Sequence, residues 1–135
     1  MGKVKDPAAR IRGAQARAMG EALELAARAD LMNQGCIVHR IATPTASRRG
    51  RRVFVAQVPG DLFGCTVDGL ALLVECKHRT CSSGRTVKPV PSDFEPHQVE
   101  ALRQWHRQGG IALVAYFDPT KRVQLVPAVT IVGSG

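Results

Sequence analysis

Apolar residues in the first quarter of the chain recur at the spacing of an α-helix. From about Gln15 onward the apolar residues Met19, Leu23, Ala26, Ala27 and Leu31 recur at steps of three and four positions, which predicts a helix. Gly35 is expected to end this helix in a left-handed conformation. A second helix is predicted from Glu95-Pro96 to Gly109-Gly110, because proline suits a first turn and glycine a helix end. Its buried face is marked by Val99, Leu102 and Trp105 or His106.

Shorter apolar stretches predict β-strands. They lie at 36–41, 53–58, 70–77, 111–117 and 123–126, with 61–65 as a short extended piece and 42–52 and 79–92 as irregular segments. The predicted order, α-β-β-β-α-β-β, favours an α/β fold with a mixed β-sheet flanked by helices. Residues 1–17 are expected to form a basic N-terminal arm, loose or partly helical, and residues 18–135 a single domain.

Composition narrows the class of partner. The 135 residues carry a formal net charge of +8, which favours polyanions such as nucleic acid. Aromatic residues make up 4% of the chain, so a stacking platform for single strands is less favoured. No apolar run reaches the roughly 20 residues of a membrane span and no signal peptide is recognised, so a cytoplasmic protein is expected.

Cysteine spacing gives little support for a zinc site. None of the four cysteines forms a C-x-x-C pair. Cys76, His78 and Cys81 lie close in sequence, and a zinc-binding module is a minor alternative. Buried, reduced cysteines are the simpler interpretation, with Cys81 on a loop.

The strand at 70–77 ends in two charged residues on one face. Glu75 and Lys77 are two positions apart, so their side chains point together, whereas Cys76 points into the core. Asp61 lies fourteen positions upstream across a turn, and strand pairing would place it beside Glu75. Two adjacent carboxylates repel unless a cation lies between them. Oxygen ligands favour Mg²⁺, with Mn²⁺ as a substitute. Lys77 would orient an attacking water or help to deprotonate it, and would offset charge on the phosphate.

The pattern Asp61…Glu75-x-Lys77 resembles the PD-(D/E)xK nuclease superfamily, although Gly60 separates Pro59 from the aspartate. Three further segments resemble Holliday junction resolvases of the RecU and archaeal Hjc types. They are Gly20-x-x-x-Glu24 ahead of Gly35, Phe94-x-x-His97-Gln98, and Gly109-Gly110-Ile111-Ala112. The resemblance covers about residues 20–117. It implies a restriction-endonuclease-like fold, a homodimer that cuts paired strands symmetrically, and hydrolysis that leaves a 5′-phosphate.

The resemblance extends the predicted site beyond Asp61, Glu75 and Lys77. It implies that Glu24 is a metal ligand or acidic partner, whereas as an ordinary helix residue Glu24 would be solvated. It also implies that Gln98 lies near the site, where it would bond a water, the phosphate or a metal ligand. His97 has a site role or a structural role at the helix start.

Two basic segments are predicted to contact DNA phosphates. Residues 43–52 hold four arginines among hydroxyl side chains, and a second basic stretch follows the catalytic strand. The predicted contacts are Thr45, Ser47, Arg48, Arg49, Arg51, Arg52, Arg79, Arg85 and Lys88. A solvated turn is the alternative for the first segment.

The expected function is therefore a magnesium-dependent endonuclease that resolves four-way junctions in branched DNA. A restriction, repair or nicking nuclease of the same superfamily would use the same core residues. A catalytically silent DNA-binding module is the alternative from another class, and the clustered acids argue against it, because acids facing DNA do not help binding.

Overall fold

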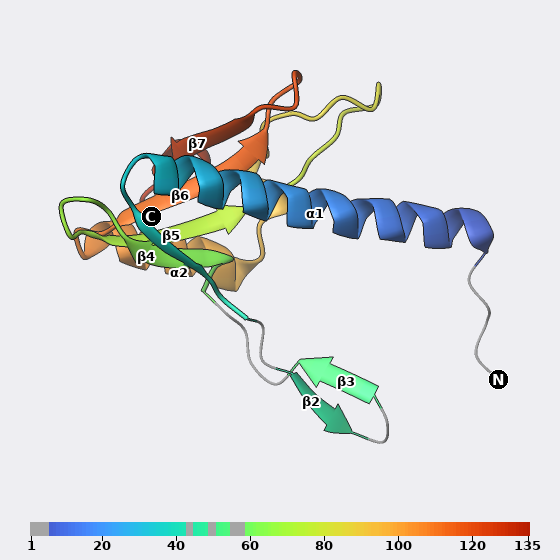
Figure 1. The fold of residues 1–135 in the computed structure, drawn as a ribbon, viewed down its shortest axis with the longest axis horizontal. Helices are drawn as coiled ribbons and strands as arrows, with labels where there is room; N and C mark the ends of the chain where they lie inside the picture. The colour runs from blue at the N-terminus through green and yellow to red at the C-terminus, as the bar shows by residue number, and fades with distance from the viewer. Residues whose placement is uncertain (1–5, 43–44, 49–50, 55–58) are drawn as a thin grey trace.

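The computed structural model describes residues 6–42 and 59–135, together with the backbone of residues 45–48 and 51–54. A five-stranded mixed β-sheet in the order β1-β4-β5-β6-β7 forms its centre (Figure 1). Strands β5 and β6 run parallel and the other neighbours antiparallel. The predicted α/β class with a mixed sheet between helices is confirmed. The strands are β1 (Ile37–Arg40), β4 (Leu62–Cys65), β5 (Ala71–Cys76), β6 (Ile111–Phe117) and β7 (Val123–Pro127).

Helices cover the two faces of this sheet. On one face α1 (Pro7–Asn33) packs Leu23 and Leu31 against Leu72 of β5. On the other face α2 (Pro96–Arg107) and the short α3 (Val129–Val132) form a second apolar cluster that includes Leu73. Consecutive residues of β5 therefore pack into apolar clusters on opposite faces of the sheet, as the alternation of side chains along a strand requires. The α3 helix was not predicted.

Helix α1 starts earlier than its apolar pattern indicated. The Asp6 carboxylate accepts a hydrogen bond from the Ala8 amide at 3.0 Å, and Pro7 occupies the first turn, so the helix begins at Pro7 and not near Gln15. Residues 7–17 of the expected basic arm thus belong to α1. The predicted end is confirmed, because Gly35 adopts a φ of +90°, where glycine has no side chain to clash.

A small hairpin interrupts the chain between β1 and β4. Strands β2 (Thr45–Arg48) and β3 (Arg51–Phe54) pair with each other and form a separate two-stranded sheet. The prediction of an irregular segment over 42–52 was wrong there. Of the strand expected at 53–58, β3 includes only Val53 and Phe54, and residues 55–58 lie outside the described part of the chain. The middle strand of the β1-β4-β5 meander is instead β4, which was expected only as a short extended piece.

The second half of the chain follows the predicted order more closely. The predicted bounds of β6 agree with the structure, and α2 ends before Gly109, which has a φ of +87°. The irregular segment 79–92 contains a bridge between Thr80 and Thr86 and leads into a 3₁₀ turn, η1 (Pro91–Asp93). Among the described helices, none combines the length and the apolar content needed to cross a membrane.

Candidate active site

Asp61 extends the sheet by one residue ahead of β4. Its amide donates to the Val74 carbonyl at 2.9 Å, and its own carbonyl accepts from the Ile41 amide at 2.8 Å. Its carboxylate accepts from the Cys76 amide at 2.7 Å. The side chain is thereby held against the backbone of β5 at the position between Glu75 and Lys77. The predicted pairing of Asp61 with the end of this strand is confirmed.

Glu75 and Lys77 extend from the same face of the end of β5. Their Oε1 and Nζ atoms are 4.0 Å apart, and Lys77 also lies over the Phe94 ring at 5.4 Å from its centroid. The residue between them, Cys76, packs on the opposite face against the core under α1. The predicted alternation of Glu75, Cys76 and Lys77 is confirmed.

The Glu75 carboxyl group has an unusual electrostatic environment. Only 3% of the residue is exposed. Burial raises its pKa to about 9, the charge and hydrogen bond of Asp61 add to the rise, and Lys77 opposes it. Burial therefore favours the neutral form of the Glu75 carboxyl group, and the neighbouring Asp61 charge adds to that preference.

Gln98 joins this group from the first turn of α2. Its Nε2 donates to Glu75 Oε1 at 3.0 Å, and its Oε1 accepts from the Glu95 amide at 2.9 Å. One side chain thus caps the helix start and holds the buried carboxyl group. The structure brings Gln98 next to Glu75, whereas His97 lies half-buried in the same turn with no described contact to the acids.

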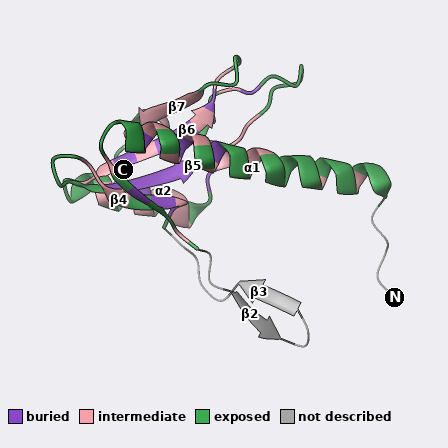
Figure 2. Cartoon of the chain, viewed as in Figure 1, coloured by how far each residue is buried: buried purple, intermediate pink, exposed green. Residues whose placement is uncertain are grey.

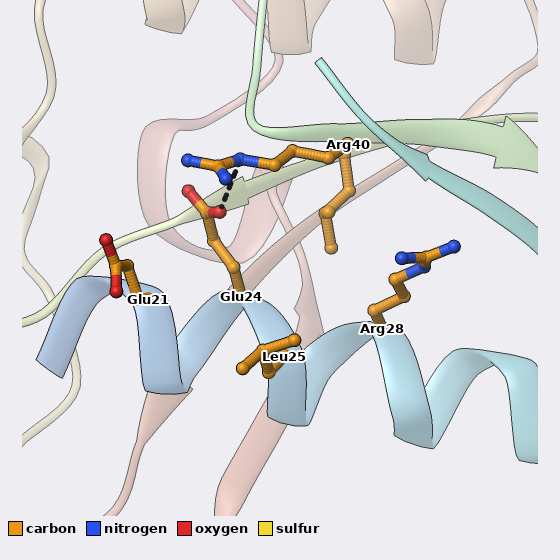
Figure 3. A pocket seen from close by; sticks show the side chains of 6 residues that line it. Glu21, Glu24, Leu25, Arg28 and Arg40 are labelled. Carbon is orange, nitrogen blue, oxygen red and sulfur yellow. Dashed lines mark ion pairs between the residues drawn. The ribbon is translucent and has the colours of Figure 1, made fainter. Parts of the chain in front are cut away.

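Glu24 approaches Asp61 from α1. Figure 3 shows its carboxylate pointing to Arg40 of β1, with an Oε2–Nε distance of 3.1 Å. Burial raises the pKa of Glu24, the Asp61 charge raises it further, and Arg40 lowers it. An open hollow of about 390 Å³ lies beside these residues, lined by Glu24, Arg40, Ile41, Ala42 and Asp61. The Asp61 charge thus raises the pKa of one acid on each face of the sheet, Glu24 and Glu75.

The donor set fits a magnesium ion held by two carboxylates. In the described part of the chain, no three acidic, histidine or cysteine side chains are placed to bind one ion together, so Glu24 is not grouped with Asp61 and Glu75 as a third ligand. Mg²⁺ usually uses one or two carboxylates and retains several waters. Asp61 and Glu75 match this requirement.

The cysteines give no support to the zinc alternative. Burial, and then the nearby acids, raise the pKa of the Cys76 thiol well above its usual range, which disfavours the thiolate that zinc requires. Cys81 is exposed on the loop after β5.

The predicted DNA contacts are only partly described. Arg49 and the side chains of Thr45, Ser47, Arg48, Arg51 and Arg52 lie outside the described residues. Arg79 is held by Asp93, with an Nη1–Oδ1 distance of 2.8 Å. Arg85 and Lys88 are exposed on the loop between β5 and α2.

Arg40 is the charged residue that the sequence reasoning missed. Its position at the end of β1 is visible in the sequence, but its pairing with Glu24 depends on how α1 lies on the sheet.

Comparison with known protein families finds no match to this chain, and no curated protein matches it.

Proposed function

We propose that this protein is a magnesium-dependent DNA endonuclease of the PD-(D/E)xK type. The observation that carries the proposal is the buried carboxyl group of Glu75, placed beside Asp61 and 4.0 Å from the Lys77 ammonium. A structural salt bridge would need one acid and one base. A second acid adds repulsion, which a divalent cation relieves.

The residues divide the chemistry among them. Asp61 and Glu75 would hold Mg²⁺, which supplies a more acidic bound water and offsets charge on the phosphate. Lys77 orients the water and neutralises phosphate charge. Gln98 and Glu24 are positioning residues, acting through Glu75 and Asp61. In the reaction a bond forms from water oxygen to phosphorus and the bond to the 3′-oxygen breaks. The products are a 5′-phosphate and a 3′-hydroxyl, which takes one proton of the water.

The substrate we propose is a four-way DNA junction, cut by a homodimer that nicks two strands symmetrically. The support is the resemblance of the segments around Glu24, Gln98 and Gly109 to junction resolvases, together with the net charge of +8. The restriction-endonuclease-like fold belongs to the same proposal. It is consistent with the β1-β4-β5 meander, the parallel β6 and the acids at the end of β5.

Asp61→Asn tests the site against a matched control. The exchange keeps the shape of the side chain, and we expect Mg²⁺-dependent cleavage of a labelled junction to fall by at least ~100-fold, which corresponds to about 3 kcal/mol of barrier. Junction binding should persist. Asp68→Asn, in the exposed turn after β4, should cleave like the wild type. Undiminished cleavage by Asp61→Asn would contradict the assigned site.

Cleavage of a matched linear duplex distinguishes a junction resolvase from another nuclease of the superfamily. Symmetric nicks confined to the junction support resolution, whereas equal cutting of the duplex supports a restriction, repair or nicking enzyme. A wild-type protein that binds the junction but cleaves neither substrate, in Mg²⁺ or Mn²⁺, would be a DNA-binding module, and the nuclease proposal would fail.

A further inference from the structure

Two turns lie side by side at the end of the sheet that carries the candidate active site. One is the hairpin of residues 79–87, in which Thr80 and Thr86 form a β-bridge. The other is the turn of residues 118–122, between β6 and β7. Strands β5 and β6 are parallel, so both turns, here called the paired turns, project past the same end of the sheet, in yellow and orange-red (Figure 1). Both are exposed over most of their length (Figure 2).

A buried contact joins the paired turns. The Thr86 hydroxyl donates a hydrogen bond to the Asp118 carbonyl, and Thr86 is only 3% exposed. The Asp118 carboxylate accepts from the Thr120 hydroxyl at 2.6 Å and from the amides of Thr120 and Arg122 at 2.8 and 3.1 Å. Gln124 Nε2 donates to its second oxygen at 2.8 Å. The bond from the Thr120 hydroxyl, together with the other three, lowers the pKa of Asp118 to about 2. The carboxylate is therefore ionised at neutral pH and holds the turn in one shape.

The side chains that the paired turns expose are basic. Residues 78–92 and 119–122 contain no acidic residue, and the carboxylate of Asp118 is occupied by its own hydrogen bonds. The exposed cations are Arg85, Lys121 and Arg122, with Lys88 directly after the hairpin. The sequence predicted phosphate contacts for Arg85 and Lys88, but not for the two residues after β6. A surface of one sign attracts a polyanion.

Lys121 has a backbone conformation that favours glycine. In the described part of the chain it is the only residue other than glycine with a positive φ, which is +62°. Its amide donates to the Asp118 carbonyl at 2.8 Å, and short hairpin turns commonly place glycine at such a position. Residues with a β-carbon adopt this region at a cost in free energy. Because glycine would make the turn more stable, turn stability does not account for the lysine, and a use for its charge does.

We propose that the paired turns bind the phosphate backbone of one duplex arm of the DNA substrate, with Lys121 and Arg122 among the contacts. The inference rests on the proposed function. The Lys77 amide bonds to the Ala115 carbonyl at 3.0 Å, and Asp118 follows three residues later, so at about 3.3 Å per residue the turn lies about 10 Å beyond Lys77. Base pairs recur every ~3.4 Å along a duplex, which places the contacted phosphates about three base pairs from the cleaved bond. Phosphate contacts position a duplex without reading its sequence, so the paired turns would determine how the arm lies on the protein.

Lys121→Gly separates DNA binding from stability. Glycine relieves the positive φ, so this variant should melt at a higher temperature than the wild type. It should nevertheless bind a labelled four-way junction about fivefold more weakly, and the slope of log K against log salt should fall by about 1. Fluorescence anisotropy in metal-free buffer measures binding without cleavage. Arg122→Gln keeps the backbone bonds of the turn and should show the same loss of binding without the gain in melting temperature.

Arg107→Gln is the charge-matched control. It removes one positive charge at the end of α2, where Arg107 pairs with Glu100 at 3.1 Å, and it should change junction binding less than about twofold. Equal losses in this control and in the turn variants would mean that net charge alone determines binding, and would overturn the inference. Wild-type affinity in both turn variants would also overturn it. A wild type that binds no DNA would instead overturn the proposed function, and the inference with it.

Neutral phosphates locate the contact. Single methylphosphonate groups, scanned along one junction arm, should identify one short stretch at which wild-type binding weakens, about three base pairs from the cleaved bond. The same groups should have little effect on a variant that combines Lys121→Gly with Arg122→Gln, because that variant has already lost the contacts. Equal sensitivity of the two proteins along the whole arm would overturn the inference.

Discussion

Replacing Glu75 with glutamine is expected to stabilise the metal-free protein and to abolish the proposed cleavage. Glutamine keeps the size of the side chain and an oxygen for the bond from Gln98 Nε2. Its amide can donate to Asp61, the acid whose charge and hydrogen bond raise the pKa of Glu75. The exchange therefore removes the group that must take up a proton on folding, without leaving a buried polar group unpaired.

The magnitude follows from the pKa of Glu75. Its value is about 9 in the folded protein and 4.5 in the unfolded chain, so between these pH values only the folded state retains the proton. Folding stability of the wild type then falls as the pH rises from about 4.5 to about 9. Each pH unit above 4.5 lowers the free energy of unfolding by about 1.4 kcal/mol. At pH 7, about 2.5 units higher, the wild type has therefore lost about 3 kcal/mol. The Glu75→Gln variant keeps this stability and should melt roughly 10 °C higher than the wild type at pH 7.

Thermal melts in metal-free buffer at pH 5, 7 and 8.5 measure the effect. The advantage of Glu75→Gln should grow with pH. Added Mg²⁺ should stabilise the wild type more at pH 8.5 than at pH 5, because bound metal requires ionised carboxylates, and should not stabilise the variant. Glu100→Gln is the control, at a side chain 57% exposed. A wild-type stability that does not change between pH 5 and 8.5, or a variant that melts below the wild type at pH 8.5, would refute the reasoning.

Three further exchanges test separate parts of the structure. Lys77→Met keeps the packing over Phe94 but removes the ammonium group, so cleavage should fall by at least ~100-fold. Calorimetry should still detect Mg²⁺ binding to this variant. A loss of Mg²⁺ binding would instead make Lys77 a structural residue. Gln98→Ala should reduce cleavage about 10- to 100-fold and lower the unfolding free energy by about 1 kcal/mol, because the Glu95 amide loses its acceptor. Unchanged kinetics would remove Gln98 from the site. Gly64→Ala would place a β-carbon in steric conflict with the Ile37 carbonyl oxygen, so chemical denaturation should show a loss of at least ~2 kcal/mol of unfolding free energy. The control Gly20→Ala has nothing within 4 Å and should raise stability by about 0.5–1 kcal/mol.

The elements that could be predicted from the sequence are those with a buried face. Strand β5 is apolar on both sides, and its two charged end residues stand out against that pattern. The hairpin β2–β3 was missed because its strands are rich in arginine, serine and threonine and lack an apolar period. The first half of α1 was missed for a related reason, since none of its residues is buried against the described part of the chain. Asp6-Pro7 is nevertheless a recognisable helix start in the sequence.

In the candidate site, too, some contacts could be predicted from local sequence spacing and others could not. The approach of Asp61 to Glu75 follows from strand pairing across a short turn, so local spacing is sufficient to predict it. The bond from Gln98 to Glu75 crosses from α2 to β5, and the resemblance to the resolvases anticipated that proximity, whereas spacing alone did not. The Arg40–Glu24 pair depends on the rotation of α1 about its axis, which a pattern that starts at Gln15 does not determine.

The hydrogen bond from the Ile41 amide to the Asp61 carbonyl closes the base of the segment that contains β2 and β3. Residues 42–58 connect β1 to β4, and the ends of this connection are fixed by the bond and by the pairing of the two strands, so its length can vary without moving Asp61. Because doubling a flexible loop costs only about 0.6 kcal/mol of closure entropy, this point can accept additional sequence at small cost. A designer could therefore exchange the hairpin for another segment and leave the acids in place.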